Sequence, residues 1–224
     1  MPEHPLTQRA RVFLVDDHPL VRESLARLIN QQTDMQVCGE AEDVDEALRG
    51  ITASSPDAAI VDISLQGTSG LELIKSLKRT MPSCATIVLS MHDERIYAER
   101  AIRAGARGYV MKRESTKRIV SAIRDVVRGK LCVSDEVAET LAQRDYRPTS
   151  GSPVEALSDR ELEVFTLIGA GRETRQIAEQ MNVSMKTVQA YCARIKEKLR
   201  LASATELLRE AVRWQERQSK DVSL

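Results

Sequence analysis

Five polar side chains in the first half of the chain could together carry out one kind of chemistry. They are Asp16, Asp17, Asp62, Ser90 and Lys112. Carboxylates crowded together repel one another unless a cation holds them ionised, and Mg²⁺ is the hard cation that prefers their oxygens. A lysine can neutralise a phosphoryl oxygen, a hydroxyl can donate a hydrogen bond to another, and a carboxylate can act as nucleophile. This combination indicates Mg²⁺-dependent phosphoryl transfer.

The elements that must position these residues are predicted from the hydrophobic pattern. Short apolar segments alternate with longer amphipathic ones, which is typical of five β/α units in a doubly wound α/β fold with a five-stranded parallel sheet. The expected strands are nearly continuously apolar, as strands covered on both faces are. They span residues 12–15, 35–39, 58–61, 86–89 and 108–111.

Each of the five polar residues ends or follows one of four of these strands. In an open parallel sheet, ligands bind beyond the carboxyl ends of the strands, so we expect the five side chains to converge on one pocket. Asp62 is the candidate nucleophile, because it ends the central strand and precedes a glycine-bearing loop, SLQGTSG. Taken one at a time, an aspartate pair before His-Pro also suits a turn and helix cap.

The second half of the chain has a different pattern. RDYRPTSGSP, residues 144–153, reads as a linker, and Ser134 is expected to cap a short helix through Gln143. From Leu157 onward only helices are predicted, and S-x-x-E capping boxes begin two of them, at Ser158 and Ser203. The expected divisions are a first domain at 1–130, a helix and flexible linker at 131–156, a small all-α domain at 157–218 and a tail at 219–224.

Composition excludes several classes of protein. The 224 residues carry 33 Lys+Arg and 33 Asp+Glu, so global charge predicts no partner. No apolar run approaches the roughly 20 residues of a membrane span, which sets aside a membrane or secretory role. The four cysteines have no C-x-x-C or zinc-site spacing, which favours a reducing, cytoplasmic location.

Basic charge in the second domain is concentrated on one predicted helix, from Ser184 to Leu199. That helix has an apolar stripe at Val188, Ile195 and Leu199. It follows a shorter helix and a tight connection, so it could expose a basic face to the DNA major groove. The simpler alternative is a solvated charged face.

The first half resembles the receiver domains of two-component response regulators. The resemblance lies in VDDHPLVR, DISLQGTSGLEL, the strand end VLSMH, and GARGYVMK. The resemblance, and not the hydrophobic pattern, implies a flavodoxin-like sheet with strand order 2-1-3-4-5. It also implies that Asp62 accepts a phosphoryl group from a sensor histidine kinase. Asp17 and Asp62 would bind Mg²⁺ directly with the Ser64 carbonyl, and Asp16 would assist through water.

The same resemblance implies a signalling set. Ser90 and Lys112 would sense the phosphoryl group, and Tyr109 would change rotamer on activation. Ser90 stands where threonine is commoner, and Gln66 where many receivers carry proline, but neither removes a required chemical group. In this family the positions of Ser64 and His92 tune the lifetime of the phosphoryl group.

The second half resembles the LuxR-type helix-turn-helix domain. The resemblance covers about 50 residues, including R-E-x-E-V, Q-I-A-E, V-S-x-K-T-V and I-x-x-K-L. With a receiver it indicates a NarL/FixJ-type response regulator, which is a transcription factor that binds promoter DNA, forms a homodimer on activation and has RNA polymerase as a candidate partner. Residues implied to face the groove are Lys186, Gln189, Ala190 and Ala193. Those implied to contact phosphate are Arg175, Thr187, Arg194 and Lys198.

The last predicted helix, Ala204 to Trp214, is the one that pairs two DNA-binding domains in this family. The residues that would do so are Leu207, Leu208, Ala211 and Val212; packing in the core of the domain is their simpler role. Tyr191 and Cys192 replace a histidine and a basic residue of many relatives, which bears on the details of DNA readout.

Two other classes of protein share part of these features. A haloacid-dehalogenase-type phosphatase also uses a strand-end aspartate, but it needs a second aspartate where this chain has Ser64. A ligand-sensing LuxR-type regulator would need an aromatic-lined pocket, and only 3% of the residues are aromatic.

Overall fold

A computed structural model describes residues 9–65, 68–144 and 153–220. The chain divides into two compact units, Met1–Leu141 and Ala142–Leu224. Each unit is described by itself. The boundary falls later than the expected end of the first domain, at residue 130, because the chain after it still packs on the first unit.

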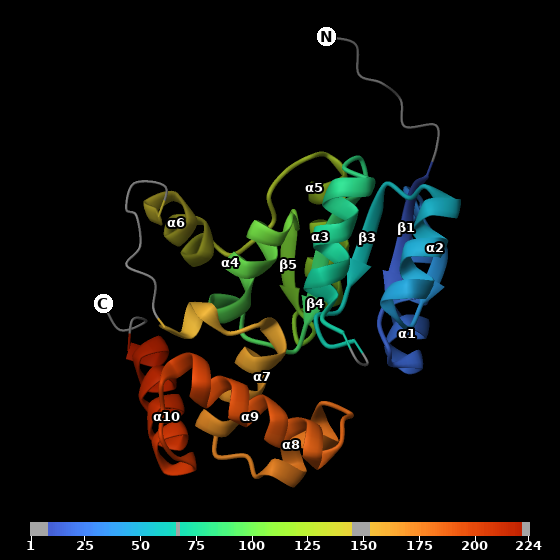
Figure 1. Cartoon of the computed structure of the whole chain (residues 1–224). Helices are drawn as coiled ribbons and strands as arrows, with labels where there is room; N and C mark the ends of the chain where they lie inside the picture. The colour runs from blue at the N-terminus through green and yellow to red at the C-terminus, as the bar shows by residue number, and fades with distance from the viewer. Residues whose placement is uncertain (1–8, 66–67, 145–152, 221–224) are drawn as a thin grey trace. The chain divides into compact units, whose positions relative to one another are not determined.

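The first unit is built on a parallel sheet (Figure 1). In the described residues it has five strands in the order β2-β1-β3-β4-β5, as the resemblance implied. The strands are β1 (Ala10–Val15), β2 (Met35–Ala41), β3 (Ala58–Val61), β4 (Ala85–Ser90) and β5 (Gly108–Met111). All the predicted strands are confirmed, and three of them are longer than predicted by one or two residues at an end.

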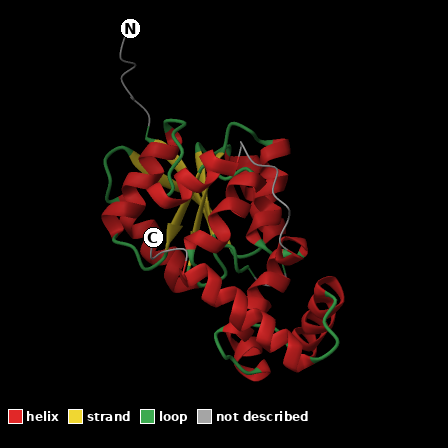
Figure 2. Cartoon of the chain, turned by 90° about the vertical axis from the view of Figure 1, so that its left-hand side faces the viewer, coloured by secondary structure: helices red, strands yellow, loops and turns green. Residues whose placement is uncertain are grey.

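Helices cover both faces of this sheet, as Figure 2 shows with strands in yellow between helices in red. The helices are α1 (Pro19–Asn30), α2 (Val44–Ser54), α3 (Gly70–Thr80), α4 (Glu94–Ala104) and α5 (Thr116–Val127). Leu14 of β1 packs in one core cluster with Ile29 of α1 and Ile123 of α5. The neighbouring residue Phe13 points to the other face, where its ring contacts Gly50 of α2. Consecutive strand residues therefore serve two separate cores.

The open edge of β5 is covered by the segment that follows α5. Cys132 forms a parallel bridge with Gly108, and its carbonyl accepts the Tyr109 amide at 2.9 Å. Ser134 then caps helix α6 (Asp135–Arg144) by accepting the Val137 amide, as the sequence predicted. Pairing this edge removes an exposed row of backbone donors and acceptors.

The described part of the second unit contains the four expected α-helices and a short 3-10 helix, η1. They are η1 (Pro153–Ala156), α7 (Asp159–Gly169), α8 (Thr174–Gln180), α9 (Met185–Leu199) and α10 (Ala204–Lys220). The capping box at Ser158 is confirmed, since Ser158 and Glu161 exchange both hydrogen bonds. At Ser203 only half of the box forms, because the Glu206 carboxylate accepts from the Ala202 amide instead.

Close approach of α7 and α10 fixes the core of this unit. A Cβ on Gly169 would lie 2.8 Å from the backbone oxygen of Ala211. The rings of Phe165 and Trp214 pack nearby with centroids 5.8 Å apart. Helix α10 runs beyond the predicted end at Trp214 because its final turns carry helix-forming residues that the apolar pattern does not mark.

Candidate functional site

The carboxyl ends of β1, β3 and β5 bring three charged side chains together. The ammonium of Lys112 lies 2.6 Å from Oδ2 of Asp62 and 2.6 Å from Oδ2 of Asp16. Both carboxylate side chains are 4% exposed. Asp62 follows directly on β3, a strand whose four residues are all buried. The predicted convergence of these residues is thus seen in the structure.

Asp17 and His18 complete the cluster on its other side. Asp16, Asp17, His18 and Asp62 each offer one ligand atom, and these atoms all lie within 4.8 Å of one another. The Asp17 side chain is 10% exposed, and its Oδ1 lies 2.8 Å from the ring nitrogen Nδ1 of His18. Carboxylates this close together repel one another, and a divalent cation would hold them ionised. The chemistry of the donor set therefore fits Mg²⁺.

Burial and charge act in opposite directions on this pocket. Burial raises the pKa of the Asp62 carboxyl, Lys112 works against that rise, and Asp16 adds to it. Burial alone would lower the pKa of Lys112, but Asp62 and Asp16 outweigh it and the pKa is raised. Lys112 is therefore held as a cation, and a second cation would help to keep all three carboxylates ionised.

The loop after Asp62 is held close by a glycine. A Cβ on Gly70, the first residue of α3, would collide with the backbone oxygen of Asp62. The Gly70 amide donates to the Ile63 carbonyl at 2.8 Å, and Ser64 forms a bridge with Ser69. Gly70 thus lets α3 begin directly beside the candidate nucleophile. Gln66 lies outside the described residues.

The predicted signalling residues form one connected set around His92. The His92 amide donates to Ser90 Oγ at 3.2 Å, and the His92 carbonyl accepts the Tyr109 hydroxyl at 3.0 Å. The His92 ring is 2.9 Å from Ser64 Oγ and packs on the ring of Tyr97. Tyr109 is buried, and burial raises its pKa, so its hydroxyl remains a donor. The sequence marked Ser64 and His92 separately, but not their contact.

In the second unit, α8 and α9 form the predicted helix-turn-helix. Asn182, between them, adopts the left-handed conformation with φ 51°, which turns the chain sharply. Ser184 Oγ then caps α9 by accepting the Thr187 amide. Val188 and Ile195 are fully buried, as predicted, while Leu199 is only half-buried.

The residues implied to face the DNA groove share one side of α9. Lys186, Gln189, Ala190 and Ala193 are all exposed, at spacings that place them on adjacent turns. Of the residues implied to contact phosphate, Arg194 is exposed, and Thr187 is half-buried with its hydroxyl 2.8 Å from that of Ser184.

Two of the implied phosphate contacts already have partners within the unit. Arg175 pairs with Glu179 on the surface of α8. Lys198 lies 2.6 Å from the buried Glu161 carboxylate and also bonds the Ala156 carbonyl. Lys198 therefore joins α9 to α7 in this structure. This contact gave no local signal in the sequence, since 37 residues separate the partners.

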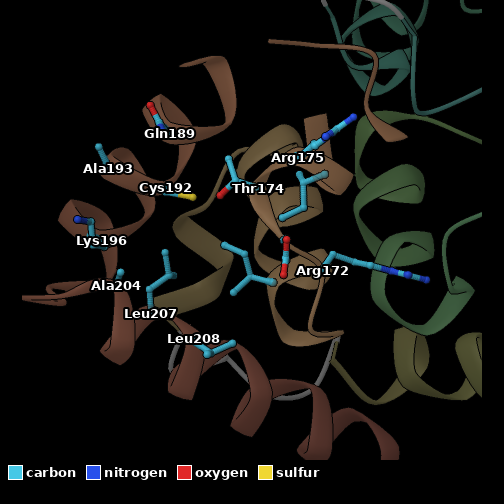
Figure 3. A pocket seen from close by; sticks show the side chains of 13 residues that line it. Arg172, Thr174, Arg175, Gln189, Cys192, Ala193, Lys196, Ala204, Leu207 and Leu208 are labelled. Carbon is cyan, nitrogen blue, oxygen red and sulfur yellow. The ribbon is translucent and has the colours of Figure 1, made fainter. Parts of the chain in front are cut away.

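A groove of about 650 Å³ lies beside α9 (Figure 3). One wall carries Gln189 and Ala193 of α9, and another carries Leu207 and Leu208 of α10. Of the residues expected to pair two domains, Leu207 and Ala211 are buried in this unit, whereas Leu208 is 46% exposed and Val212 is half-buried.

Comparisons with known proteins identify both units. Residues 12–124 match the response regulator receiver domain, and residues 155–211 match the bacterial regulatory proteins of the luxR family. The response regulator UvrY of Escherichia coli K12 is 34% identical over 203 residues, covering 90% of this chain and 93% of UvrY. The chain belongs to the NarL/FixJ family of two-component response regulators.

Other relatives of this response regulator extend over nearly its whole length. The response regulator GacA of Pseudomonas protegens is 34% identical over 203 residues, covering 91% of this chain and 95% of GacA. RcsB of Salmonella enterica serovar Typhimurium, bound to promoter rprA in the presence of phosphomimetic BeF3⁻, is 25% identical with a TM-score of 0.59, covering 90% of this chain and 98% of that one.

Family membership decides the class of the protein. It is a response regulator with a receiver domain and a LuxR-type DNA-binding domain, as the sequence predicted. The haloacid-dehalogenase alternative and the ligand-sensing alternative are both set aside, because the first unit is a receiver. Within the described residues, no helix has the length and apolar character needed to cross a bilayer.

Proposed function

We propose that Asp62 accepts a phosphoryl group from a sensor histidine kinase and that this event controls dimerisation and promoter binding. The observation that carries the proposal is the contact of the Lys112 ammonium with Asp62 at 2.6 Å, in a buried pocket lined by Asp16 and Asp17. Such a pocket has a nucleophile, a cation to neutralise developing charge and carboxylate oxygens that can ligate a metal.

The chain's own residues account for each part of the transfer. An Asp62 carboxylate oxygen attacks phosphorus of the kinase phosphohistidine, the phosphorus–nitrogen bond breaks, and the leaving imidazole takes a proton. Mg²⁺, held by Asp17, Asp62 and the Ser64 carbonyl with help from Asp16, would supply charge neutralisation on the phosphoryl oxygens. During the transfer, the Lys112 ammonium exchanges its contact with a carboxylate oxygen for one with a phosphoryl oxygen. The catalysis that we propose is limited to the protein's own phosphorylation and dephosphorylation, and it is otherwise not an enzyme.

The signal leaves the pocket through Ser90. Its oxygen now accepts from the His92 amide, and its own hydrogen can be donated to a phosphoryl oxygen. The acyl phosphate carries about 1.5 to 2 negative charges where the carboxylate carried one, so the attraction on Ser90 and Lys112 increases. Because the His92 carbonyl is bonded to Tyr109, movement of Ser90 reaches the surface formed by α4 and β5.

That surface is where we place the pairing of two receivers. Joining two receivers raises the effective concentration of their DNA-binding domains at adjacent half-sites. We assign base contacts to Lys186, Gln189, Ala190 and Ala193, and phosphate contacts to Arg175, Thr187 and Arg194. Gln189 suits adenine and Ala190 a thymine methyl. Leu208 and Val212 of α10 would form the contact between the two DNA-binding domains. We place the phosphoryl transfer and the DNA binding in the cytoplasm, in keeping with the four free cysteine thiols.

The test compares two aspartate variants on the full chain. A DNA fragment is first selected from a random-sequence pool with protein treated with acetyl phosphate and Mg²⁺. Wild type should bind that fragment more tightly after the treatment, whereas Asp62→Asn should show no gain. Asp45→Asn is the matched control, because Asp45 lies on the exposed first turn of α2. An equal gain in Asp62→Asn and wild type would reject the proposal.

A further inference from the structure

The guanidinium of Arg22, in the first turn of α1, reaches back to the end of β1. Its Nη1 donates to the backbone carbonyl of Asp16 at 2.5 Å, and its Nε lies 3.6 Å from Oε2 of Glu40 on β2. The Arg22 side chain is 15% exposed, whereas that of Glu40 is 41% exposed. A short hydrogen bond from a charged donor is stronger than a long ion pair with a partly exposed partner. The Asp16 carbonyl is therefore the main partner of Arg22.

This contact completes the set of bonds that holds Asp16. Its amide donates to the Ala41 carbonyl at 3.2 Å. One of its carboxylate oxygens accepts the His18 amide at 2.9 Å, and the other lies 2.6 Å from the Lys112 ammonium. Arg22 holds the remaining polar group, the carbonyl. Every polar group of Asp16 thus has a partner, and the partner of the carbonyl is a side chain of α1.

The carbonyl that Arg22 holds belongs to the peptide that joins Asp16 to Asp17. A peptide group is planar, so a bond to its oxygen fixes the direction in which the next residue leaves the strand. Both aspartates belong to the carboxylate cluster, whose ligand atoms all lie within 4.8 Å of one another. Without Arg22 this peptide would be free to rotate, and its rotation would carry the Asp17 carboxylate away from the cluster.

We propose that Arg22 is a positioning residue for the metal pocket, which holds the peptide between Asp16 and Asp17 so that both carboxylates face one Mg²⁺ ion. Removing a group that orients metal ligands typically lowers metal affinity by about 10- to 100-fold. This inference rests on the Mg²⁺ site of the proposed function, and it concerns binding of the ion rather than phosphoryl transfer.

Charge alone predicts a change of the opposite sign. A guanidinium near the pocket repels Mg²⁺, so the loss of its charge would by itself strengthen binding of the ion. Loss of the bond to the Asp16 carbonyl would weaken binding instead. The direction in which Mg²⁺ affinity changes when Arg22 is replaced therefore distinguishes positioning from simple electrostatics.

The test measures Mg²⁺ binding to the full-length protein by isothermal calorimetry, without a phosphodonor. Arg22→Met should weaken Mg²⁺ binding by about tenfold or more. Arg22→Lys keeps a charged donor without the forked guanidinium, so its affinity should lie between those of Arg22→Met and wild type. Arg27→Met is the matched control, because it removes the same charge from an exposed position of α1, where Arg27 pairs with Glu23. It should bind Mg²⁺ as wild type does.

Glu40→Gln separates the carbonyl contact of Arg22 from its ion pair. It removes the charge that faces Arg22 Nε and should leave Mg²⁺ affinity unchanged. Circular dichroism and urea denaturation check folding and stability. The inference is overturned if Arg22→Met and Arg22→Lys both bind Mg²⁺ at least as tightly as wild type, whatever stability they lose. It is also overturned if Glu40→Gln weakens binding as much as Arg22→Met.

The same proteins distinguish this inference from the proposed function. If Mg²⁺ binding depended on Arg22 as expected but acetyl phosphate did not label wild type, the inference would stand and the proposed phosphorylation would fail. If wild type were labelled and bound Mg²⁺ but Arg22→Met bound it equally well, only the inference would fail. A wild type that bound no Mg²⁺ would overturn the metal site and the role of Arg22 together.

Discussion

The hydroxyl of Tyr109 donates a hydrogen bond to the backbone carbonyl of His92 at a distance of 3.0 Å. The two residues lie on β5 and on the loop after β4, and the His92 amide is bonded in turn to Ser90. A buried side chain on β5 is thus linked through a single residue to Ser90 on the neighbouring strand β4, whose hydroxyl we propose senses the phosphoryl group.

Removing the Tyr109 hydroxyl tests this link. Tyr109→Phe keeps the buried ring but leaves the His92 carbonyl without its donor, so we expect a loss of about 1 to 3 kcal/mol in the free energy of unfolding, measured by urea denaturation. Phosphorylation of Asp62 should persist, while the accompanying gain in DNA affinity should shrink. A variant with full stability and a full gain would show that the contact transmits nothing.

Mg²⁺ should stabilise the folded receiver. A ligand that binds only the native state raises the unfolding temperature with its concentration, and the Asp17 carboxylate is one of the groups that would hold Mg²⁺. Differential scanning fluorimetry should show a rise in wild type and little or none in Asp17→Asn. The Asp45→Asn protein serves as the control and should respond as wild type does. An equal rise in unfolding temperature in wild type, Asp17→Asn and Asp45→Asn would show that Mg²⁺ binds at a site that does not include Asp17.

Acid should switch off phosphorylation, because the nucleophile must be ionised. Burial raises the pKa of Asp62 in the metal-free pocket, with Lys112 opposing and Asp16 reinforcing the rise, whereas bound Mg²⁺ would act against it; in either state the carboxylate is lost as pH falls through the pKa of the folded protein. The rate of labelling by acetyl phosphate, measured between pH 4 and 8 by intact mass, should rise with pH to a plateau. A rate independent of pH across that range would contradict the assignment of the nucleophile.

The Glu94 carboxylate ties α4 to the start of α6. It accepts the Ser134 amide at 2.8 Å, and burial raises its pKa while that hydrogen bond partly offsets the rise. Glu94→Ala leaves a partly buried donor unsatisfied and should lose about 1 to 3 kcal/mol in the free energy of unfolding.

Glu94→Gln is the matched variant, because its amide oxygen can still accept that hydrogen bond. The raised pKa means that the folded state favours the neutral side chain, so at pH 7 this variant should be at least as stable as wild type. Urea denaturation measures both proteins, and hydrogen exchange of the Ser134 amide should be faster only in Glu94→Ala. Identical exchange in the two variants would show that the contact does not form.

Lys186 and Lys198 should differ although both are lysines on α9. Lys186 is exposed, so Lys186→Ala should reduce the slope of log affinity against log salt for DNA by about 1. Lys198 pairs with the buried Glu161; burial would raise the pKa of Glu161, but Lys198 and the Ser158 bonds outweigh it and lower that pKa. Lys198→Met should therefore lose about 1 to 3 kcal/mol of stability.

The contribution of this ion pair depends on pH. Because the folded pKa of Glu161 is lowered, the stabilisation is present above the unfolded pKa and disappears as pH falls through the folded one. Urea denaturation of wild type and Lys198→Met at two pH values should show a difference that narrows in acid. If Lys198→Met changed the slope of log DNA affinity against log salt and Lys186→Ala did not, Lys198 rather than Lys186 would be the residue that contacts DNA phosphate.

The sequence predicts the pocket well because its geometry follows from topology. Parallel strands bring their carboxyl ends to one edge, so Asp16, Asp62 and Lys112 could be placed together from their positions alone. Helix caps at Ser134 and Ser158 were also predictable, since they depend on residues three apart.

Contacts between distant segments could not be predicted in this way. The Glu94 bond to Ser134 spans 40 residues, and the Glu161 pair with Lys198 spans 37. The apolar pattern predicts that the Leu207 side chain is buried. It does not show whether the residue packs in the core of its own DNA-binding unit or against a second copy of the protein. The ring of His18 is a similar case, because its position depends on how α1 begins over the sheet edge.

Labelling of Asp62 tests the central claim most directly. The full-length protein is incubated with acetyl phosphate and Mg²⁺, the acyl phosphate is trapped by reduction with borohydride, and peptides are mapped by mass spectrometry. We predict modification at Asp62 in wild type, none at that position without Mg²⁺, and none in Asp62→Asn. Modification at another residue, or none at Asp62 in the presence of both reagents, would contradict the account.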